Sequence, residues 1–135
     1  AGALMTALPD TGVDVLMGIG GSPEAVVAAC ALRCLGGEIQ CRLWPRDEAE
    51  RNQAELDGLD LGRILTTRDL AAGEDVFFAA TGVSDGEVLK GVRYYSHGAR
   101  TQSIVMRSYS GTIRMVEAEH NFEKLQKITE LYGER

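Results

Sequence analysis

One stretch of the sequence constrains the possible folds of this chain most. It is an apolar run that ends in a glycine cluster and is followed directly by residues typical of a helix start. Residues 13–19 are apolar apart from Asp14 and Gly18, too continuous for a half-exposed strand and too short to cross a bilayer. The run predicts a buried strand. Gly20 and Gly21 then predict a tight turn, because glycine tolerates positive φ and lets a ligand approach the backbone closely. A strand, a glycine turn and a helix in this order are typical of α/β proteins.

The residues after the turn are ones that start helices. We expect Ser22 to be the N-cap, Pro23 to take the first helical position and Glu24 to lie in the first turn, where a carboxylate suits the helix dipole. Free amides at such a turn can bind an anion, and a carboxylate beside them can hold a divalent cation. The same arrangement also occurs without a ligand, so spacing alone leaves both interpretations open.

Composition indicates one globular domain, and we expect it to cover residues 1–135. The chain is 44% hydrophobic and 25% charged, which is enough for one core. Fourteen basic against twenty acidic residues give a formal charge of −6, which argues against a nucleic-acid surface. The apolar runs are shorter than a membrane span and no signal peptide is evident, so we expect no membrane contact and a cytoplasmic location.

The three cysteines support the same location. Cys30 and Cys34 lie one turn apart on the expected helix, and neither they nor Cys41 have the spacing to histidines that a metal site needs. Free cysteine behaves as a small buried hydrophobe. We therefore expect reduced core cysteines in a cytoplasmic protein.

The rest of the chain alternates between strand and helix patterns. Helical spacing continues from Pro23 to Gly36, which is a suitable C-cap. The later elements that we expect are a half-exposed strand over 38–43, a surface helix over 47–58, a brief helix over 68–72 capped by Thr66 or Thr67, a buried strand over 75–81, a meander of three strands over 92–119 and a final helix capped by Asn121. These elements predict an α/β domain, with a mixed β-sheet of roughly five strands flanked by helices.

Two of these elements are predicted in more detail. Residues 101–106 and 112–117 should form the antiparallel part of the sheet. The final helix carries one apolar stripe, which should dock on the sheet or on a partner. The stripe consists of Phe122, Leu125, Ile128 and Leu131.

A second candidate site follows the strand over residues 75–81. Thr81, Gly82 and Asp85 lie where that strand ends, and open α/β sheets tend to bind ligands at the carboxyl ends of their strands. These residues are more typical of an ordinary polar turn. A ligand site there is therefore the less favoured interpretation.

The two histidines offer little metal chemistry. His97 lies in a turn with no obvious second ligand, so we expect an exposed side chain. His120 lies near Glu117 and Glu119, but neighbouring strand positions point to opposite faces. A metal site at His120 is therefore the less favoured interpretation.

Several motifs taken together resemble the class II fructose-1,6-bisphosphatases. The likeness covers nearly the whole chain, which makes it specific even though each glycine motif alone is weak. The motifs are Gly-Ile-Gly-Gly-Ser-Pro-Glu at 18–24, Leu-Gly-Gly-Glu at 35–38, Arg-Leu-Trp-Pro-Arg at 42–46, Phe-Ala-Ala-Thr-Gly-Val-Ser-Asp-Gly at 78–86, Gly-Val-Arg-Tyr at 91–94 and Thr-Gln-Ser-Ile-Val-Met-Arg-Ser at 101–108.

The resemblance implies a metal-dependent sugar phosphatase of the inositol-monophosphatase-like superfamily. Such an enzyme removes the 1-phosphate of fructose 1,6-bisphosphate with Mg²⁺ or Mn²⁺, and sedoheptulose 1,7-bisphosphate is a second candidate substrate. The family's metal-binding glutamate maps onto Glu24, and its substrate-contacting glycine maps onto Gly21. Backbone amides at Gly20 and Ser22 are expected to bind the phosphate alongside Gly21.

The family's other metal carboxylates, its Lys/Arg substrate segment and its Asp-Gly-Asp motif precede the matched region. The resemblance therefore implies the carboxyl-terminal half of the fold, which is inactive alone because one glutamate cannot surround a divalent cation. We expect it to associate with the missing amino-terminal part or to form a homo-oligomer. The alternative function is a non-catalytic sugar-phosphate-binding module.

Overall fold

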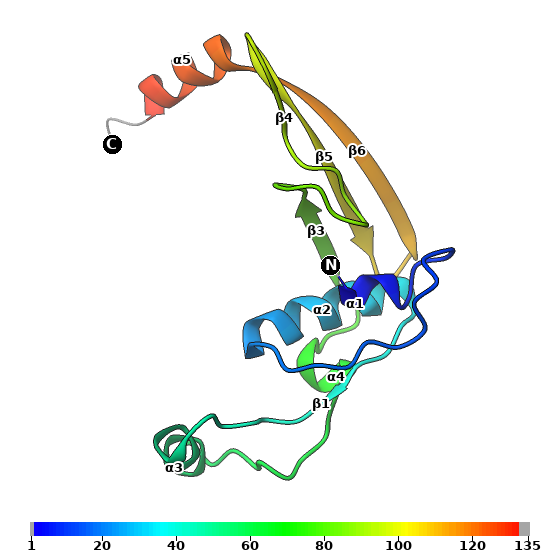
Figure 1. Ribbon diagram of the computed structural model, residues 1–135, viewed down its shortest axis with the longest axis vertical. Coiled ribbons are helices and arrows are strands. Elements are labelled where there is room, and N and C mark those ends of the chain that lie inside the picture. The colour runs from blue at the N-terminus through cyan, green and yellow to red at the C-terminus, as the bar shows by residue number, and fades with distance from the viewer. Residues whose placement is uncertain (1, 133–135) are drawn as a thin grey trace.

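The computed structural model describes residues 2–132 and contains helices together with two antiparallel sheets (Figure 1). The α/β character is therefore confirmed, but the described strands pair only antiparallel, so the predicted mixed sheet of five strands is wrong. The elements are α1 (Gly2–Met5), α2 (Ser22–Leu35), β1 (Gln40–Cys41), α3 (Glu48–Leu56), β2 (Leu65–Thr66), α4 (Thr67–Leu70), β3 (Phe77–Thr81), β4 (Arg93–Tyr95), β5 (Gly98–Arg107), β6 (Thr112–Asn121) and α5 (Phe122–Tyr132).

The larger sheet is built around β5. One edge of β5 pairs with β6 along the full length of both strands, and the other edge pairs first with β4 and then with β3. Ile104 lies opposite Ala80 on β3 and Met115 on β6. This arrangement confirms the predicted meander and the antiparallel pairing of residues 101–106 with 112–117. The pairing of these strands follows from the alternation of apolar and polar residues along them, because such alternation fixes the register of a sheet with one buried face.

The core lies where α2 packs on β3 and β5, with α1 packed against α2. Its buried members are Leu4, Ala31, Cys34, Phe78, Ile104 and Met106. Ile104 and Met106 are among the largest fully buried side chains, and each contributes roughly 1.5–3 kcal/mol of hydrophobic burial. The small residues of α2 allow its close approach to the sheet. The strand β3 alternates instead of being buried throughout as predicted, since Phe78 is 8% exposed and Phe77 is 66% exposed.

The cysteines are free thiols, as predicted. Cys34 is buried in the core, whereas Cys30 and Cys41 are partly buried. Burial raises the pKa of the Cys34 thiol, with smaller effects from neighbouring charges. A buried thiol with a raised pKa is chemically inert, which supports a packing role.

The predicted buried strand over residues 13–19 is not formed. The segment has no strand partner among the described residues, and Met17 and Ile19 are 90% and 85% exposed. An extended backbone becomes a strand only when a neighbour completes its ladder of hydrogen bonds. The predicted strand over 38–43 is shortened to Gln40–Cys41 for a similar reason, because β2 pairs with those two residues only.

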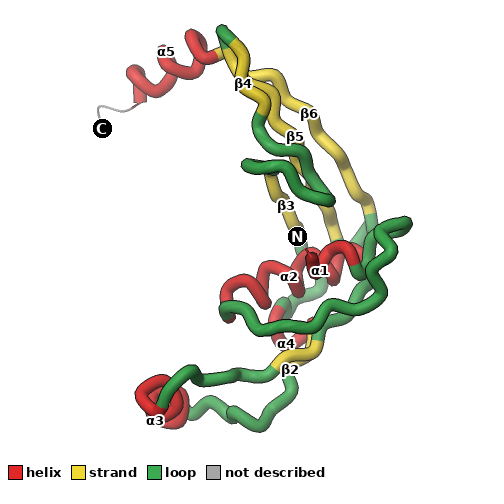
Figure 2. Tube along the Cα trace, in the orientation of Figure 1, coloured by secondary structure: helices red, strands yellow, loops and turns green. Residues whose placement is uncertain are grey.

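Residues 42–64 form an arm that stands away from the body of the molecule. Figure 2 shows α3 joined to the remainder by two loop segments. No residue of α3 is buried, which confirms the predicted surface helix. The Asp47 side chain caps it by accepting a hydrogen bond from the Glu50 backbone N–H at 2.9 Å. After the arm, Thr66 caps α4 in a reciprocal capping box with Asp69.

The final helix begins as predicted but does not dock on the sheet. Asn121 Oδ1 accepts a hydrogen bond from the Lys124 backbone N–H at 3.1 Å, and α5 then projects beyond the end of the sheet (Figure 1). Phe122, Leu125 and Ile128 are 41–51% exposed. The side chain of Leu131 lies outside those that the structure describes. No helix among residues 2–132 is both long and apolar enough to span a bilayer.

Candidate functional site

The candidate site is the start of α2, where the glycine turn leads into the helix. The N-cap is Gly21, with φ −72° and ψ 154°, and no side chain caps the helix. Ser22 is the first helical residue, so its predicted N-cap role is wrong. Neither Gly20 nor Gly21 has positive φ, so the predicted conformational reason for these glycines is also wrong. The uncapped first-turn amides remain open to an anion.

The end of the flexible Glu24 side chain lies close to the backbone of Gly21. A Cβ atom built on Gly21 would lie 2.1 Å from Glu24 Oε2, far inside van der Waals contact. The carboxylate of Glu24 is therefore folded back over the backbone of the N-cap residue. This geometry places a negatively charged oxygen next to open backbone amides, which is where a cation bridging a carboxylate and a phosphate would lie.

The site residues are all accessible. Gly20, Gly21, Ser22 and Glu24 are exposed. No group of three or more His, Cys, Asp or Glu side chains in residues 2–132 could hold a metal ion. Glu24 fits the role of one oxygen ligand, but the described residues do not form a complete shell for a divalent cation, which takes six or more ligands.

The loop after β3 uses its polar groups internally. Asp85 Oδ1 accepts from the Gly91 backbone N–H at 2.9 Å, and both of its oxygens accept from Arg93 Nη2 at 2.9 Å. The Gly91 amide, followed by the Arg93 guanidinium, lowers the pKa of Asp85. Thr81 Oγ1 lies 2.8 Å from Ser103 Oγ, and a Cβ on Gly82 would meet the Lys90 carbonyl oxygen at 2.1 Å. These contacts favour an ordinary structural turn over a ligand site.

His120 is likewise engaged in structural contacts. Its Nε2 lies 2.8 Å from Thr101 Oγ1 on the neighbouring strand. Glu119 accepts hydrogen bonds from Tyr95 Oη and Arg100 Nε, each at 2.6 Å, and these two donors lower its pKa. The less favoured metal site at His120 is not present among the described residues. His97 is exposed, as expected for a turn.

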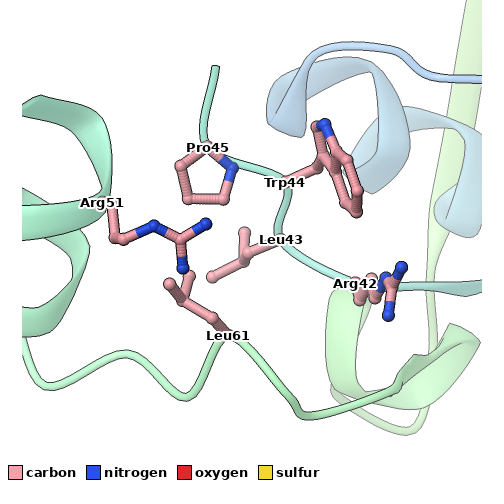
Figure 3. A pocket seen from close by; sticks show the side chains of 6 residues that line it. All are labelled: Arg42, Leu43, Trp44, Pro45, Arg51 and Leu61. Carbon is pink, nitrogen blue, oxygen red and sulfur yellow. The ribbon is translucent and has the colours of Figure 1, made fainter. Parts of the chain in front are cut away.

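A hollow of about 160 Å³ on the arm was not predicted from the sequence (Figure 3). The Arg42 guanidinium lies 5.1 Å from the centre of the Trp44 ring, a cation–π contact. Figure 3 shows the guanidinium groups of Arg42 and Arg51 on opposite sides of Leu43, so they do not converge on one point. The sequence signal that could have predicted this hollow is the cluster of arginine, tryptophan and proline residues that lines it. The hollow lacks the geometry of an anion clamp.

Comparison with protein families assigns the chain to a known family. Residues 1–120 match the family described as bacterial fructose-1,6-bisphosphatase, glpX-encoded. Because the match covers most of the chain, the protein belongs to this family. The resemblance drawn from the motifs is confirmed.

Individual relatives agree with this assignment. The chain is 38% identical over 141 aligned residues to the fructose-1,6-bisphosphatase class 2 of Haemophilus influenzae, covering 95% of this chain and 42% of that protein. It is 40% identical over 131 residues to the D-fructose 1,6-bisphosphatase class 2/sedoheptulose 1,7-bisphosphatase of Synechococcus sp. (strain JA-3-3Ab), covering 87% and 38%. The chain thus spans less than half the length of these curated relatives.

Proposed function

We propose that this chain is the carboxyl-terminal portion of a metal-dependent sugar bisphosphatase that hydrolyses the 1-phosphate of fructose 1,6-bisphosphate. The observation that carries the proposal is the Glu24 carboxylate folded over Gly21 at the uncapped start of α2. Membership of the family and the names of its relatives supply the reaction class. The inositol-monophosphatase-like fold of the whole protein is part of the same proposal.

In this proposal each site residue has a distinct role. Glu24 supplies one oxygen ligand to Mg²⁺ or Mn²⁺, and the backbone amides at Gly20, Gly21 and Ser22 bind the phosphate at the positive end of α2. The cation, when bound, neutralises phosphoryl oxygens and lowers the pKa of a coordinated water. The remaining carboxylates would come from the rest of the protein, since residues 2–132 form no such cluster.

Substitution of Glu24 in the intact protein tests the ligand role. Glu24→Gln keeps the size of the side chain but removes its charge, so metal-dependent turnover should fall by about 100-fold or more. The matched control is Glu48→Gln, another exposed first-turn glutamate, which should retain full turnover. Circular dichroism checks that both variants fold. Unchanged turnover in folded Glu24→Gln protein would reject the assignment.

The 135-residue chain alone should not hydrolyse fructose 1,6-bisphosphate, because a single carboxylate cannot hold the catalytic cation. Phosphate release in the presence of Mg²⁺ or Mn²⁺ measures this directly. Turnover by the isolated chain at the rate of the intact protein would contradict the proposal. In the intact protein, comparison of kcat/KM for fructose 1,6-bisphosphate and sedoheptulose 1,7-bisphosphate would decide between single and dual specificity.

A non-catalytic sugar-phosphate-binding module is the second candidate. The uncapped amides of α2, which form the anion-binding half of the site, lie entirely within the chain, whereas residues 2–132 contain no complete metal-ligand set. Calorimetry with fructose 1,6-bisphosphate separates the two functions. Binding to the 135-residue chain that is the same with and without Mg²⁺ would favour the module.

A further inference from the structure

A groove of about 270 Å³ lies beside α2, between two segments that the sequence predicts as strands. Residues 14–16 line one side of the groove and residues 38–40 line the other. Leu32 of α2 contributes to its lining and is 2% exposed, and Ala3 and Thr6 lie at the α1 end. The groove thus separates two extended segments over a shared helix.

The two segments run in the same direction. Figure 1 shows that each passes back along α2, from the carboxyl end of the helix towards its amino end. Residues 13–19 lead into α2, and α2 leads into residues 38–41. This is the path of a strand, a crossover helix and a second, parallel strand. The two strand segments of such a unit are either paired directly or separated by another strand.

The two segments are not paired directly. Within the part of the chain that the structure describes, no backbone hydrogen bond joins residues 14–16 to residues 38–40. The Ile39 N–H donates to Thr67 Oγ1 at 2.9 Å, and Thr67 Oγ1 lies 3.4 Å from the Ile39 carbonyl oxygen. Because backbone groups alternate sides along an extended chain, those of Glu38 and Gln40 face the opposite side, towards the groove.

We propose that a β-strand from the part of the protein that precedes Ala1 inserts between residues 14–16 and residues 38–40. This inference rests on the proposed function, which makes the chain a carboxyl-terminal portion. The family relatives are more than twice as long as the region matched, so they contain residues that could supply the strand. The inserted strand completes both ladders and forms a sheet with one face on α2.

The geometry argues against a second copy of this chain as the source. A strand in the groove must bond on both edges at once. The described strands of a second copy already have partners, so none of them has both edges free. The lining side chains Val15, Leu16, Leu32 and Ile39 are apolar, so the inserted strand should present apolar residues to α2.

Photo-crosslinking in the intact protein tests the insertion. A p-benzoylphenylalanine residue is placed at Val15 and, separately, at Gln40, one on each side of the groove. Both positions should crosslink within one chain to the same short stretch preceding Ala1. The matched control is Val83, which is 83% exposed on a loop outside the groove and should not label that stretch.

Hydrogen exchange of the unmodified intact protein provides a second measurement that needs no bulky probe. The amide of Gln40 and the alternate amides of residues 14–16 that face the groove should exchange about 100-fold more slowly than those of an open loop, because paired strand amides exchange only through local unfolding. Rapid exchange at these positions would overturn the proposal. Crosslinks to a second copy, or to two unrelated stretches, would also overturn it.

Assays on the same preparation separate this inference from the proposed function. Active protein without a common crosslinked stretch or slow exchange would refute the inserted strand and leave the bisphosphatase assignment intact. Inactive wild-type protein that shows both the common crosslinked stretch and slow exchange would support the inserted strand and contradict the bisphosphatase assignment.

Discussion

Two segments that the sequence predicts as strands have opposite outcomes in the structure. The strand β5 is bonded on both edges over most of its length and contributes Ile104 and Met106 to the core. The run over residues 13–19 is more apolar, with five apolar residues of seven against four of ten in β5, yet it has no strand partner among the described residues and exposes most of its side chains. Hydrophobic content therefore does not predict which of these segments is buried, whereas the presence of neighbouring strands does.

The difference teaches that a buried strand is a property of a sheet. The partners of β5 follow it or precede it closely in the chain, so a meander supplies them with short connections. Parallel strands in a crossover unit depend on neighbours that are distant in sequence. The inserted strand proposed above would give residues 13–19 the neighbour that β5 already has.

The largest expected contrast comes from matched methionine truncations in the 135-residue chain. Met106→Ala should lower the free energy of unfolding by about 2–5 kcal/mol, because Met106 is fully buried and the change leaves a cavity. Met17→Ala should change it by less than about 0.5 kcal/mol, because Met17 is 90% exposed. Urea unfolding measures both. Equal losses in the free energy of unfolding would contradict the contrast between β5 and residues 13–19, because they would show that residues 13–19 are packed.

A smaller contrast comes from two glycines. A Cβ on Gly98 would lie 1.8 Å from the His120 carbonyl oxygen, so Gly98→Ala should force β5 and β6 apart and lower stability by about 1–3 kcal/mol. Gly18 has nothing within 4 Å of such a Cβ and does not have positive φ. Gly18→Ala should be neutral or stabilise by up to about 1 kcal/mol. A large loss from Gly18→Ala would show unrecognised packing around the run.

The smallest effect concerns the ion pair that joins the start of β3 to the end of β5. Arg107 Nε donates to Asp75 Oδ2 at 2.7 Å, and this guanidinium lowers the pKa of Asp75 below its ordinary 3.8. The interaction therefore stabilises the fold above pH 3.8 and is lost as the pH falls through the lower value of the folded state. Asp75→Asn should slightly lower the urea midpoint at neutral pH.

The same comparison at acidic pH checks the cause. Below the folded-state pKa of Asp75, the wild-type and Asp75→Asn chains should have the same midpoint. Asp14→Asn, in the unpaired run, should show no such pH-dependent difference, since Asp14 has no ion pair among the described residues. A difference for Asp75→Asn that persists in acid would indicate a packing effect instead of a charge effect.

Much of the secondary structure could be predicted because its signals are local. Asp47 caps α3, Thr66 caps α4 and Asn121 caps α5, and each acts on backbone groups within its own turn. Gly36 ends α2 at φ 76°. The prediction failed for Ser22, because the backbone adopts its helical conformation one residue earlier than the cap signal implied.

The candidate site was predictable in part. The motif at residues 18–24 pointed to Gly21 and Glu24, but Gly21 does not have the predicted positive φ, and the Glu24 carboxylate lies against its backbone. For Asp85, residue type suggested either a ligand or a turn. The contacts with Gly91 and Arg93 favour the turn, and these depend on how the loop folds back.

The sequence by itself determined the approximate positions of most helices, the strands of the meander and the family to which the chain belongs. These depend on residues close together or on whole motifs. Only the tertiary structure decided that residues 13–19 have no strand partner within residues 2–132, that Gly21 lies against Glu24 and that a groove separates two strand segments over α2. The physical reason is that strand pairing and side-chain contacts join residues distant in the chain, whereas caps and periodicity act within a few residues.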